Sequence, residues 1–372
     1  MKIAIMGIRG IPANYGGFET FVEELAPRLV ERGHEVTVYG RSNIIRYDKD
    51  VYKGVKIKIL PTISHKYLDT VAHTLVCTLY SFFIRYDVVF VCNSANAVFT
   101  FMPRLMGKPV VLNVDGLEWK RKKWNWAGKA FYRISEFLAT FLPTAIVSDA
   151  KEVQAYYRHT FGKESTFIPY GAPEEKAKTN TILEKFGLLP DEYVLYVSRM
   201  EPENNAHRVV RAFEQVKTDK KLVMVGDAPY SQDYINQLKT TKDKRIIFTG
   251  YVFGQGYREL QSNAYFYVQA TEVGGTHPAL VEAMGYGNCV LANDVPEHRE
   301  VLGDAGVYFN TSGTKTLTEK MQFLLDKPSV VEKYRSMVQA RVRQNYSWEK
   351  VTDDYERLFR LVARSKHRQN VE

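Results

Sequence analysis

The sequence predicts an α/β protein with two domains, each organised around a doubly wound parallel sheet. The first observation is length, because 372 residues exceed what one ordinary hydrophobic core holds together. The second is that short, almost continuously apolar runs alternate with amphipathic stretches, as parallel strands and their covering helices do. The third is that a polar stretch, residues 174–181, interrupts this alternation before it begins again. We therefore expect an N-terminal domain over residues 1–172 and a second domain over residues 173–347.

Six apolar runs in the first half are predicted strands: Lys2–Met6, Glu35–Tyr39, Val55–Leu60, Val88–Cys92, Val110–Val114 and Ala145–Ser148. Six more follow the polar stretch: Tyr193–Ser198, Leu222–Val225, Ile246–Thr249, Phe266–Gln269, Cys289–Ala292 and Gly306–Phe309. The last predicted element is a helix over about residues 348–364, because Ser347 can cap its first turn and Glu349 favours its N-terminus. We expect this helix to pack back on the first domain.

Hydropathy and cysteine usage narrow the class of protein. No stretch reaches about 18 uninterrupted apolar residues, and the longest candidate, residues 71–84, contains four polar residues and is predicted to be a buried helix. The first residues predict a strand and a glycine turn rather than a signal peptide. The three cysteines share no metal-binding spacing and predict buried, reduced thiols. We expect a cytoplasmic protein, with peripheral attachment at the inner face of the cell membrane as a second expectation.

The net charge of +9 is unevenly distributed. Residues 104–133 hold eight basic and two acidic residues, and within them Lys120–Lys123 precede Trp124 and Trp126. A basic patch favours an anionic partner. Basic residues interleaved with tryptophan suit an anionic membrane surface. The alternative is a solvated run of charge without a function.

A glycine-rich loop follows the first predicted strand and leads into a helix. Gly16 and Gly17 stand where that helix begins, and backbone N–H groups at a helix N-terminus can hold a phosphate. The loop matches neither the dinucleotide-binding fingerprint nor the P-loop. A tight turn without a ligand is the alternative.

The second domain carries two further clusters. Arg199 leaves the carboxyl end of a predicted strand, where open α/β sheets bind ligands, and its planar guanidinium suits a diphosphate. Later, a turn over residues 274–277 leads into a helix that contains Glu282. Backbone amides of that turn can hold a phosphate, and a carboxylate one turn further can accept hydrogen bonds from ribose hydroxyls. The alternatives are a surface arginine without function and, for His277, a structural role.

Together with Pro169–Gly171 and the helix start at Ser347, these clusters resemble glycosyltransferase family 4 over nearly the whole chain. They resemble in particular its bacterial rhamnosyltransferase-like branch, whose members open with the Gly-Ile-Arg-Gly-Ile-Pro and Gly-Gly-Phe-Glu motifs found here. The resemblance implies a GT-B fold, in which two Rossmann-like domains face each other across a cleft. It implies a nucleoside-diphosphate sugar donor, no metal or other cofactor, and retention at the anomeric carbon. The branch implies a donor such as dTDP-rhamnose and a lipid-linked glycan acceptor in cell-surface polysaccharide synthesis.

The resemblance assigns donor binding to Gly16, Gly17, Arg199, Asn204, Gly274, Gly275, Thr276, His277 and Glu282. Two positions depart from the family pattern. Asn204 stands where a lysine usually accompanies the arginine, which removes one cation from the diphosphate site. Gly274 stands where a glutamate usually precedes Glu282, so the sugar-binding role of the nearby Glu272 is in doubt, and the amides of Gly275 and Thr276 can take its place.

Asp115 is the catalytic candidate. It follows a strand of the first domain and occupies the position of the family histidine that lines the sugar site. We expect it to orient the acceptor or to act as acid or base, and no covalent nucleophile is needed. A structural Asp-Gly turn is the alternative.

Two other functions are alternatives. A UDP-sugar 2-epimerase shares the fold and the diphosphate chemistry, but the sequence shows no matching set of carboxylates. A nucleic-acid-binding protein would use the basic patch, but no helix-turn-helix, finger or RNA-binding signature is present. We therefore expect no nucleic-acid partner; the expected partners are the nucleotide-sugar donor, a lipid-diphosphate-linked or oligosaccharide acceptor, and an anionic membrane surface.

Overall fold

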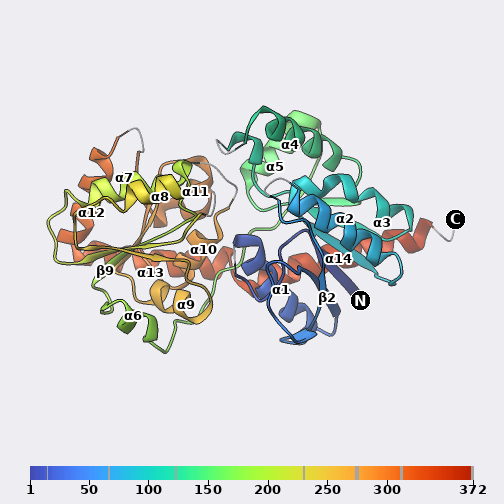
Figure 1. The fold of residues 1–372 in the computed structure, drawn as a ribbon, viewed down its shortest axis with the longest axis horizontal. Helices are drawn as coiled ribbons and strands as arrows, with labels where there is room; N and C mark the ends of the chain where they lie inside the picture. The colour runs from blue at the N-terminus through green and yellow to red at the C-terminus, as the bar shows by residue number, and fades with distance from the viewer. Residues whose placement is uncertain are drawn as a thin grey trace. The chain divides into compact units, whose positions relative to one another are not determined.

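A computed structural model describes residues 1–14, 16–65, 68–121, 124–228, 231–272, 276–310 and 313–369. The chain forms two compact units (Figure 1). Unit 1 comprises Met1–Tyr170 together with Trp348–Glu372, and unit 2 comprises Gly171–Ser347. The sequence placed the boundary two residues later. The C-terminal helix α14 (Trp348–Gln369) therefore belongs to the same unit as the first residues of the chain.

Within the described residues, unit 1 has an eight-stranded sheet in the order β3-β4-β2-β1-β5-β6-β7-β8. The strands are β1 (Lys2–Met6), β2 (Glu35–Arg41), β3 (Val51–Tyr52), β4 (Val55–Leu60), β5 (Val88–Cys92), β6 (Val110–Asn113), β7 (Ala145–Ser148) and β8 (Thr166–Phe167). All neighbours run parallel except β3, which pairs with β4 in the antiparallel direction at the sheet edge. The helices are α1 (Gly17–Glu31), α2 (Asp69–Ser81), α3 (Phe101–Leu105), α4 (Trp126–Ala139), α5 (Lys151–Phe161) and α14, with short 3-10 turns η1 (Ser94–Phe99) and η2 (Glu118–Lys120).

Alternate residues of the unit 1 strands enter two different cores, because successive side chains of a strand point to opposite faces. Ile3 and Ile5 face one core, which α1 and α14 cover. Ala4 and Met6 face the other, to which α2, η1, α4 and α5 contribute. In the first core the ring of Phe90 lies 5.3 Å from that of Tyr355. The C-terminal helix is therefore part of the hydrophobic core of unit 1.

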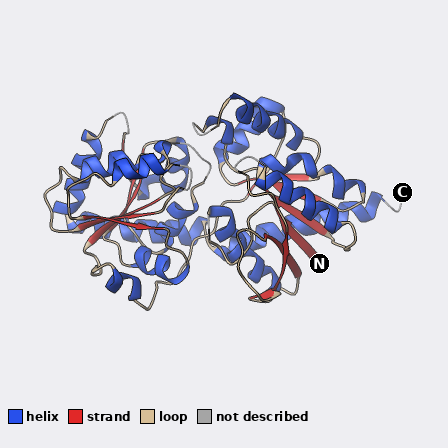
Figure 2. Cartoon of the chain, viewed as in Figure 1, coloured by secondary structure: helices blue, strands red, loops and turns tan. Residues whose placement is uncertain are grey.

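Unit 2 has a six-stranded, fully parallel sheet within the described residues, in the order β11-β10-β9-β12-β13-β14. Its strands are β9 (Tyr193–Val197), β10 (Lys221–Val225), β11 (Ile246–Gly250), β12 (Phe266–Gln269), β13 (Val290–Asn293) and β14 (Val307–Phe309). Its helices are α6 (Thr181–Lys185), α7 (Ala206–Phe213), α8 (Gln232–Leu238), α9 (Gly254–Ser262), α10 (Pro278–Gly285), α11 (Pro296–Leu302), α12 (Lys315–Asp326) and α13 (Pro328–Asn345), with 3-10 turns η3 (Pro202–Asn204) and η4 (Gly303–Ala305). Figure 2 shows the strands of each unit lying between layers of helix.

Each sheet reverses its strand order at one place. In unit 1, β1 has β2 on one side and β5 on the other, and in unit 2, β9 has β10 on one side and β12 on the other. Within unit 1 the loops after β1 and β5 therefore run in opposite directions, and within unit 2 the loops after β9 and β12 do the same. Such a divergence opens the crevice where doubly wound sheets bind ligands. The clusters singled out in the sequence follow β1, β9 and β12, so the topology brings them to these edges.

Candidate active site

The loop after β1 owes two of its glycines to close packing. Gly7 and Gly10 have φ angles of 90° and 120°, in the region that favours glycine. A Cβ on Gly7 would lie 2.3 Å from the carbonyl oxygen of Cys92, and one on Gly10 would lie 2.7 Å from the Cα of Gly40. These glycines are therefore required by the fold itself, whether or not the loop holds a ligand.

Glu19 is a buried carboxylate in the first turn of α1. Its Oε1 accepts a hydrogen bond of 2.9 Å from the N–H of Arg9, and its Oε2 points toward Gly16, which caps the helix. The positive end of the helix dipole near Gly16 and Gly17 thus already faces a negative charge, which makes this end less favourable for a diphosphate than a bare helix N-terminus. The sequence analysis quoted Glu19 in the motif but gave it no role.

Asp115 lies in the loop after β6, half-buried, with a φ of 54°. Few residues adopt this left-handed conformation, although aspartate tolerates it better than most. The N–H of Asp115 donates to Oδ1 of the buried Asn113 at 3.0 Å, and Nδ2 of Asn113 donates to the hydroxyl of Tyr355 in α14 at 3.1 Å. The backbone of the catalytic candidate is therefore held in place by the C-terminal helix.

A second carboxylate, Asp149, follows β7 at the same edge of the unit 1 sheet and is buried. Burial raises the pKa of Tyr170 well above its ordinary value, and the negative charges of Asp149 and Asp115 raise it further. Both carboxylates therefore act on the same buried tyrosine. The sequence analysis missed Asp149, although its place directly after a predicted strand could have indicated it.

In unit 2, Arg199 follows β9 and is half-buried. The buried side chain of Asn204 donates from Nδ2 to the carbonyl oxygen of Arg199 at 2.7 Å. This contact fixes the backbone that carries the guanidinium. The residue that replaces the family's lysine thus supports the arginine through its backbone.

The next residue, Asn205, joins two loops. It has a φ of 59° where α7 begins, and its Nδ2 donates to Oε1 of Glu272 and to the carbonyl oxygen of Ala270, both at 2.9 Å. The loop after β9 is thereby tied to the loop after β12. Adjacent asparagines thus support Arg199 on one side and Glu272 on the other, which gives the Glu-Pro-Glu-Asn-Asn motif a physical role.

His277 caps α10, and hydrogen bonds fix its tautomer. Nδ1 of the buried His298 lies 2.8 Å from the carbonyl oxygen of Asn293 and must donate to it. Burial lowers the pKa of His298 to about 4, so its Nε2 carries no proton and accepts from the hydroxyl of Thr271 at 3.2 Å. That hydroxyl has only one proton, so Nε2 of His277, at 3.1 Å, must donate to it. His277 is therefore held through Nε2–H.

Glu282 lies in α10 and is half-buried. Its Oε2 accepts a hydrogen bond of 2.5 Å from the hydroxyl of Tyr257 in α9, which in turn accepts from Nε2 of Gln261 at 2.9 Å. Burial raises the pKa of Tyr257 well above its ordinary value, with the charge of Glu282 as the next cause, so the hydroxyl remains a donor. The sequence analysis missed Tyr257, since it lies in a different helix.

Of the remaining predicted donor residues, Gly274 and Gly275 lie outside the described part of the chain. Thr276, the next residue, is buried. The structure thus brings Arg199, Asn204, Thr276, His277 and Glu282 to loops and helix starts beyond the carboxyl ends of β9 and β12.

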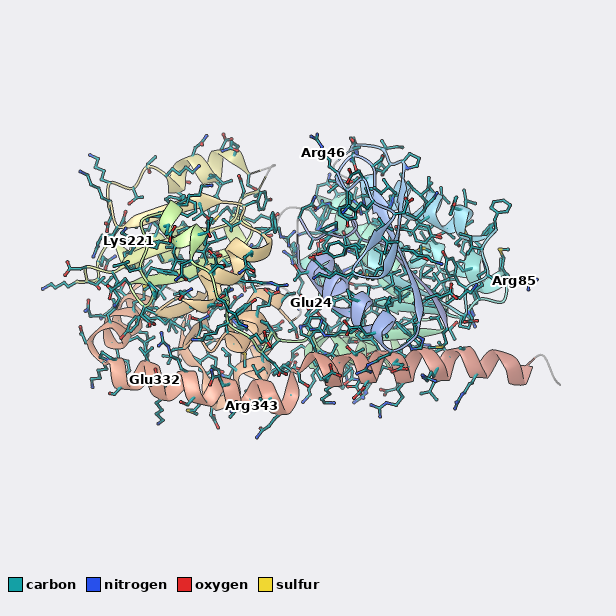
Figure 3. All side chains as sticks on the ribbon, turned by 90° about the horizontal axis from the view of Figure 1, so that it is seen from below. Glu24, Arg46, Arg85, Lys221, Glu332 and Arg343 are labelled. Atoms are coloured by element: carbon teal, nitrogen blue, oxygen red, sulfur yellow. The ribbon has the colours of Figure 1, made fainter. Side chains whose placement is uncertain are left out.

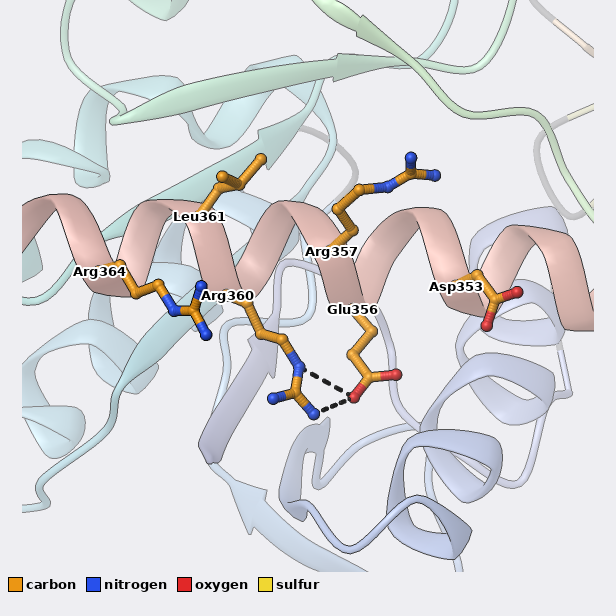
Figure 4. Close-up of a pocket in the computed structure, with 6 residues that line it drawn as sticks. All are labelled: Asp353, Glu356, Arg357, Arg360, Leu361 and Arg364. Carbon is orange, nitrogen blue, oxygen red and sulfur yellow. Dashed lines mark hydrogen bonds and ion pairs between the residues drawn. The ribbon is translucent and has the colours of Figure 1, made fainter.

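Figure 4 shows a pocket along α14, lined by Asp353, Glu356, Arg357, Arg360, Leu361 and Arg364. It contains none of the predicted site residues. Its central carboxylate, Glu356, accepts from Nη2 of Arg360 at 2.5 Å and from Nη1 of Arg32 at 3.1 Å. These contacts make it a network of paired surface charges rather than a candidate active site.

Within the part of the chain that the structure describes, no three histidine, cysteine or acidic residues lie close enough to hold a metal ion. No described helix is both long and apolar enough to cross a bilayer. The expectation that catalysis needs no metal stays a prediction.

Both halves of the chain match known protein families. Residues 1–173 match the family described as a domain of unknown function (DUF1972), and residues 191–327 match the family described as Glycosyl transferases group 1. The chain is 25% identical over 196 residues to O-antigen chain mannosyltransferase B of Escherichia coli, an alignment that spans about half of each protein, 51% in both cases.

Among solved structures, the chain resembles sucrose-phosphate synthase from Thermosynechococcus elongatus, with a TM-score of 0.82, 18% identity and coverage of 98% of this chain and 99% of that one. It also resembles Anabaena HepE, solved in complex with UDP and glucose, with a TM-score of 0.78, 16% identity and coverage of 96% and 99%. The chain has the GT-B fold, the fold of these solved glycosyltransferases. This fold confirms the predicted pair of Rossmann-like parallel-sheet domains. That the two sheets face each other across a cleft stays a prediction.

Proposed function

We propose that this protein is a glycosyltransferase that moves a sugar from a nucleoside-diphosphate sugar to a glycan acceptor during the synthesis of bacterial cell-surface polysaccharide. The main support is the pair of asparagines that links the loops after β9 and β12, because it holds Arg199 and Glu272 at the strand-order reversal of unit 2. Two similar proteins agree with this proposal, since one is an O-antigen chain mannosyltransferase and another was solved in complex with UDP and glucose.

Unit 2 takes the donor in this proposal. The guanidinium of Arg199 pairs with the diphosphate, with the amide of Thr276 as a further donor. The carboxylate of Glu282 accepts from the ribose hydroxyls, and its hydrogen bond from Tyr257 restricts its rotamer before the nucleotide arrives. His277 stands at the N-terminus of α10, where an anion is favoured.

The proposed sugar is rhamnose, delivered as dTDP-rhamnose to a lipid-linked acceptor. The support is the resemblance of the opening motif to the rhamnosyltransferase-like branch. A glycine at position 274 removes one hydrogen-bond acceptor from the sugar site, and a 6-deoxy sugar has one hydroxyl fewer to satisfy.

Transfer is proposed to retain the anomeric configuration. The bond between C1 and the diphosphate oxygen breaks while the acceptor oxygen bonds to C1 on the same face, and the acceptor proton passes to the leaving phosphate. Asp115, in unit 1, orients the acceptor hydroxyl or balances positive charge on the sugar ring. It cannot favour the diphosphate, whose charge it would repel. Protein groups then act by positioning and charge stabilisation rather than as a nucleophile.

The cytoplasm is the proposed compartment. Cys77, Cys92 and Cys289 are all buried free thiols in the structure, as a reducing environment permits.

Isothermal titration against a panel of sugar nucleotides tests the donor, followed by transfer of the labelled sugar to a lipid extract. We expect one nucleotide sugar to bind, and its sugar to appear on the extract only when the enzyme is present. Folded protein that binds no sugar nucleotide would overturn the proposal. Conversion of the sugar nucleotide to its epimer without any acceptor would replace transfer by epimerisation.

A further inference from the structure

Helix α4 is inverted relative to an ordinary amphipathic helix. Its buried side carries Tyr132, Ser135, Glu136 and Ala139. On its outer side Trp126 is 83% exposed and Ile134 is 59% exposed, and Phe137 is exposed as well. Surface helices normally turn such apolar residues toward the core and their polar residues to water. The outer side of α4 therefore has the composition of a buried surface.

Helix α2 shows the same inversion. Its buried side carries His73, Thr74, Cys77, Thr78 and Ser81, whereas Leu75, Leu79 and Tyr80 are exposed. Just beyond α2, the side chain of Phe83 is 91% exposed. The sequence analysis predicted residues 71–84 as a buried helix, and this was wrong. The polar residues that interrupt the apolar run are the ones that face inward.

The inverted orientation is supported by polar partners inside unit 1. The buried guanidinium of Arg41, at the end of β2, donates to Asp69 in the first turn of α2 at 2.7 Å. His73 lies 3.0 Å from the carbonyl oxygen of Gly40. In α4, the buried Glu136 accepts from the hydroxyl of Tyr156 at 2.8 Å. Arg41, His73 and Glu136 thus have polar partners inside unit 1, whereas the buried hydroxyl of Thr74 has none among the described residues. The exposed apolar residues follow from this native packing.

Hydrogen bonds connect the end of α2, helix α3 with the residues after it, and the segment after α4. Lys108, shortly after α3, donates to the carbonyl oxygen of Ser81, the last residue of α2, and to that of Ile84, just beyond α2. Arg104, within α3, donates to the carbonyl oxygen of Phe141, just beyond α4, at 2.7 Å. Figure 1 shows α2 and α3 side by side. The exposed side chains near these junctions include Leu105, at 80% exposure.

We define the docking face as Phe83, Leu105, Trp126, Ile134, Phe137 and Phe141. The exposed charges among the described positions 99–141 are all basic. Arg104, Lys120, Lys129 and Arg133 are exposed, whereas the acidic residues among the described positions 99–141 are buried or half-buried. Arg85 projects from the segment after α2 (Figure 3). The nearby carboxylate of Asp87 is exposed as well, and it accepts a hydrogen bond from the backbone N–H of Lys2.

We propose that the docking face inserts into the headgroup region of an anionic lipid bilayer. Exposed aromatic and aliphatic side chains flanked by cations are what an interfacial helix presents to such a surface. A second copy of the chain is a less suitable partner for the docking face. In a two-fold contact the same patch of both copies meets, so the cations of one copy would lie near the identical cations of the other. The proposal goes beyond glycosyl transfer and does not rest on it.

This placement corrects the surface expected from the sequence. Arg121 is buried and its Nε pairs with Oε1 of Glu118 at 2.5 Å, while Trp124 donates to Oε2 of the same carboxylate at 3.1 Å. These two residues of the basic and aromatic run, residues 120–126, therefore bind Glu118 within unit 1 and are not part of the docking face. Lys122 and Lys123 lie outside the described residues. Trp126 is the member of the run that joins the docking face.

Sedimentation with vesicles tests the proposal. The native protein should pellet with vesicles of phosphatidylglycerol and phosphatidylcholine, and at least tenfold less with phosphatidylcholine alone. The triple variant Ile134→Ser, Phe137→Ser, Phe141→Ser should lose most of this binding. Leu189→Ser is the matched control, because Leu189 is 67% exposed in unit 2; it should bind as the native protein does. Circular dichroism and donor titration should show the triple variant folded and able to bind the nucleotide.

Two further readouts sharpen the test. Trp126 emission should be quenched by brominated lipid acyl chains, and the Trp126→Phe variant should lose that quenching. Replacing Lys129 and Arg133 with glutamine should reduce the preference for anionic vesicles. The proposal is overturned if the native protein ignores both vesicle types or if the triple variant binds as well as the native protein. It is also overturned if the native protein is a dimer that the triple variant converts to a monomer. Intact donor binding in any of these cases would leave the proposed function standing.

Discussion

Nδ2 of Asn113 donates a hydrogen bond of 3.1 Å to the hydroxyl of Tyr355, a residue 242 positions later in the chain. Both side chains are buried. Since Asn113 also accepts from the N–H of Asp115, the C-terminal helix supports the loop of the catalytic candidate. Removing the Tyr355 hydroxyl should therefore affect turnover as well as stability.

Tyr355→Phe keeps the ring in its aromatic cluster and leaves a buried amide N–H without its acceptor. We expect a loss of about 1–3 kcal/mol in the free energy of unfolding and a lower kcat with unchanged donor affinity. Urea unfolding and single-turnover kinetics measure the two effects. Tyr193→Phe, which removes a buried bond of 2.7 Å to Leu260 in unit 2, should cost stability without lowering kcat. If Tyr355→Phe and Tyr193→Phe have the same kcat, the Tyr355 hydroxyl does not influence catalysis through Asp115.

Asp115→Asn tests charge at the catalytic candidate. Asparagine tolerates the left-handed backbone of this position and preserves side-chain volume. If the carboxylate acts on the acceptor or the sugar ring, kcat should fall by at least tenfold while donor affinity stays unchanged. Steady-state kinetics and titration with the donor separate these quantities. Near-native turnover would show that Asp115 only shapes the turn.

Arg199→Ala should weaken donor binding roughly ten- to hundredfold, because a charge-assisted hydrogen bond contributes about 1.5–3 kcal/mol. Titration with the donor measures the change. Arg211→Ala is the control, since Arg211 is exposed near the end of α7; it should bind the donor normally. Unchanged affinity in folded Arg199→Ala would exclude the diphosphate contact.

Glu282→Gln should weaken binding of the free nucleoside diphosphate and of the intact donor by a similar factor, roughly tenfold, if the carboxylate accepts from the ribose. Tyr257→Phe should weaken both by less, because it only loosens the rotamer of Glu282. A loss confined to the intact donor would place Glu282 against the transferred sugar instead.

Glu136 should make stability depend on pH. Burial raises its pKa from 4.5 to about 7, although Tyr156 and Arg133 oppose the shift. Below about pH 4.5 the folded and unfolded chains both hold the proton; between there and about pH 7 only the unfolded chain releases it, so the free energy of unfolding falls. Glu136→Gln should remove this fall, which is on the order of 1–3 kcal/mol. Urea unfolding of both proteins at pH 4.5 and 8 measures it; an identical pH profile would contradict the shift.

The strands were predictable because each is a short apolar run, and all six predicted strands of unit 2 overlap an observed strand. The edge strand β3 was missed, since two residues carry too little pattern. A helix over residues 71–84 was predictable, but the sequence could not say which of its residues face the core, because the buried partner Arg41 lies on another element.

The positions of the donor candidates could be predicted because carboxyl ends of parallel strands share one edge. Their supporting contacts could not. Tyr257 holds Glu282 from a different helix, and Tyr355 reaches Asn113 from the far end of the sequence. Such pairings depend on the packed tertiary structure, and a single sequence gives no sign of them.

The return of α14 to unit 1 sets an order of events during synthesis. Unit 2 is one uninterrupted segment, residues 171–347, whereas the core of unit 1 needs Tyr355 and Phe359 from the last helix. A nascent chain can therefore complete unit 2 while residues 1–170 still lack a wall of their core and expose Phe21 and Phe90. Helix α14 must therefore leave the ribosome before the core of unit 1 can be completed.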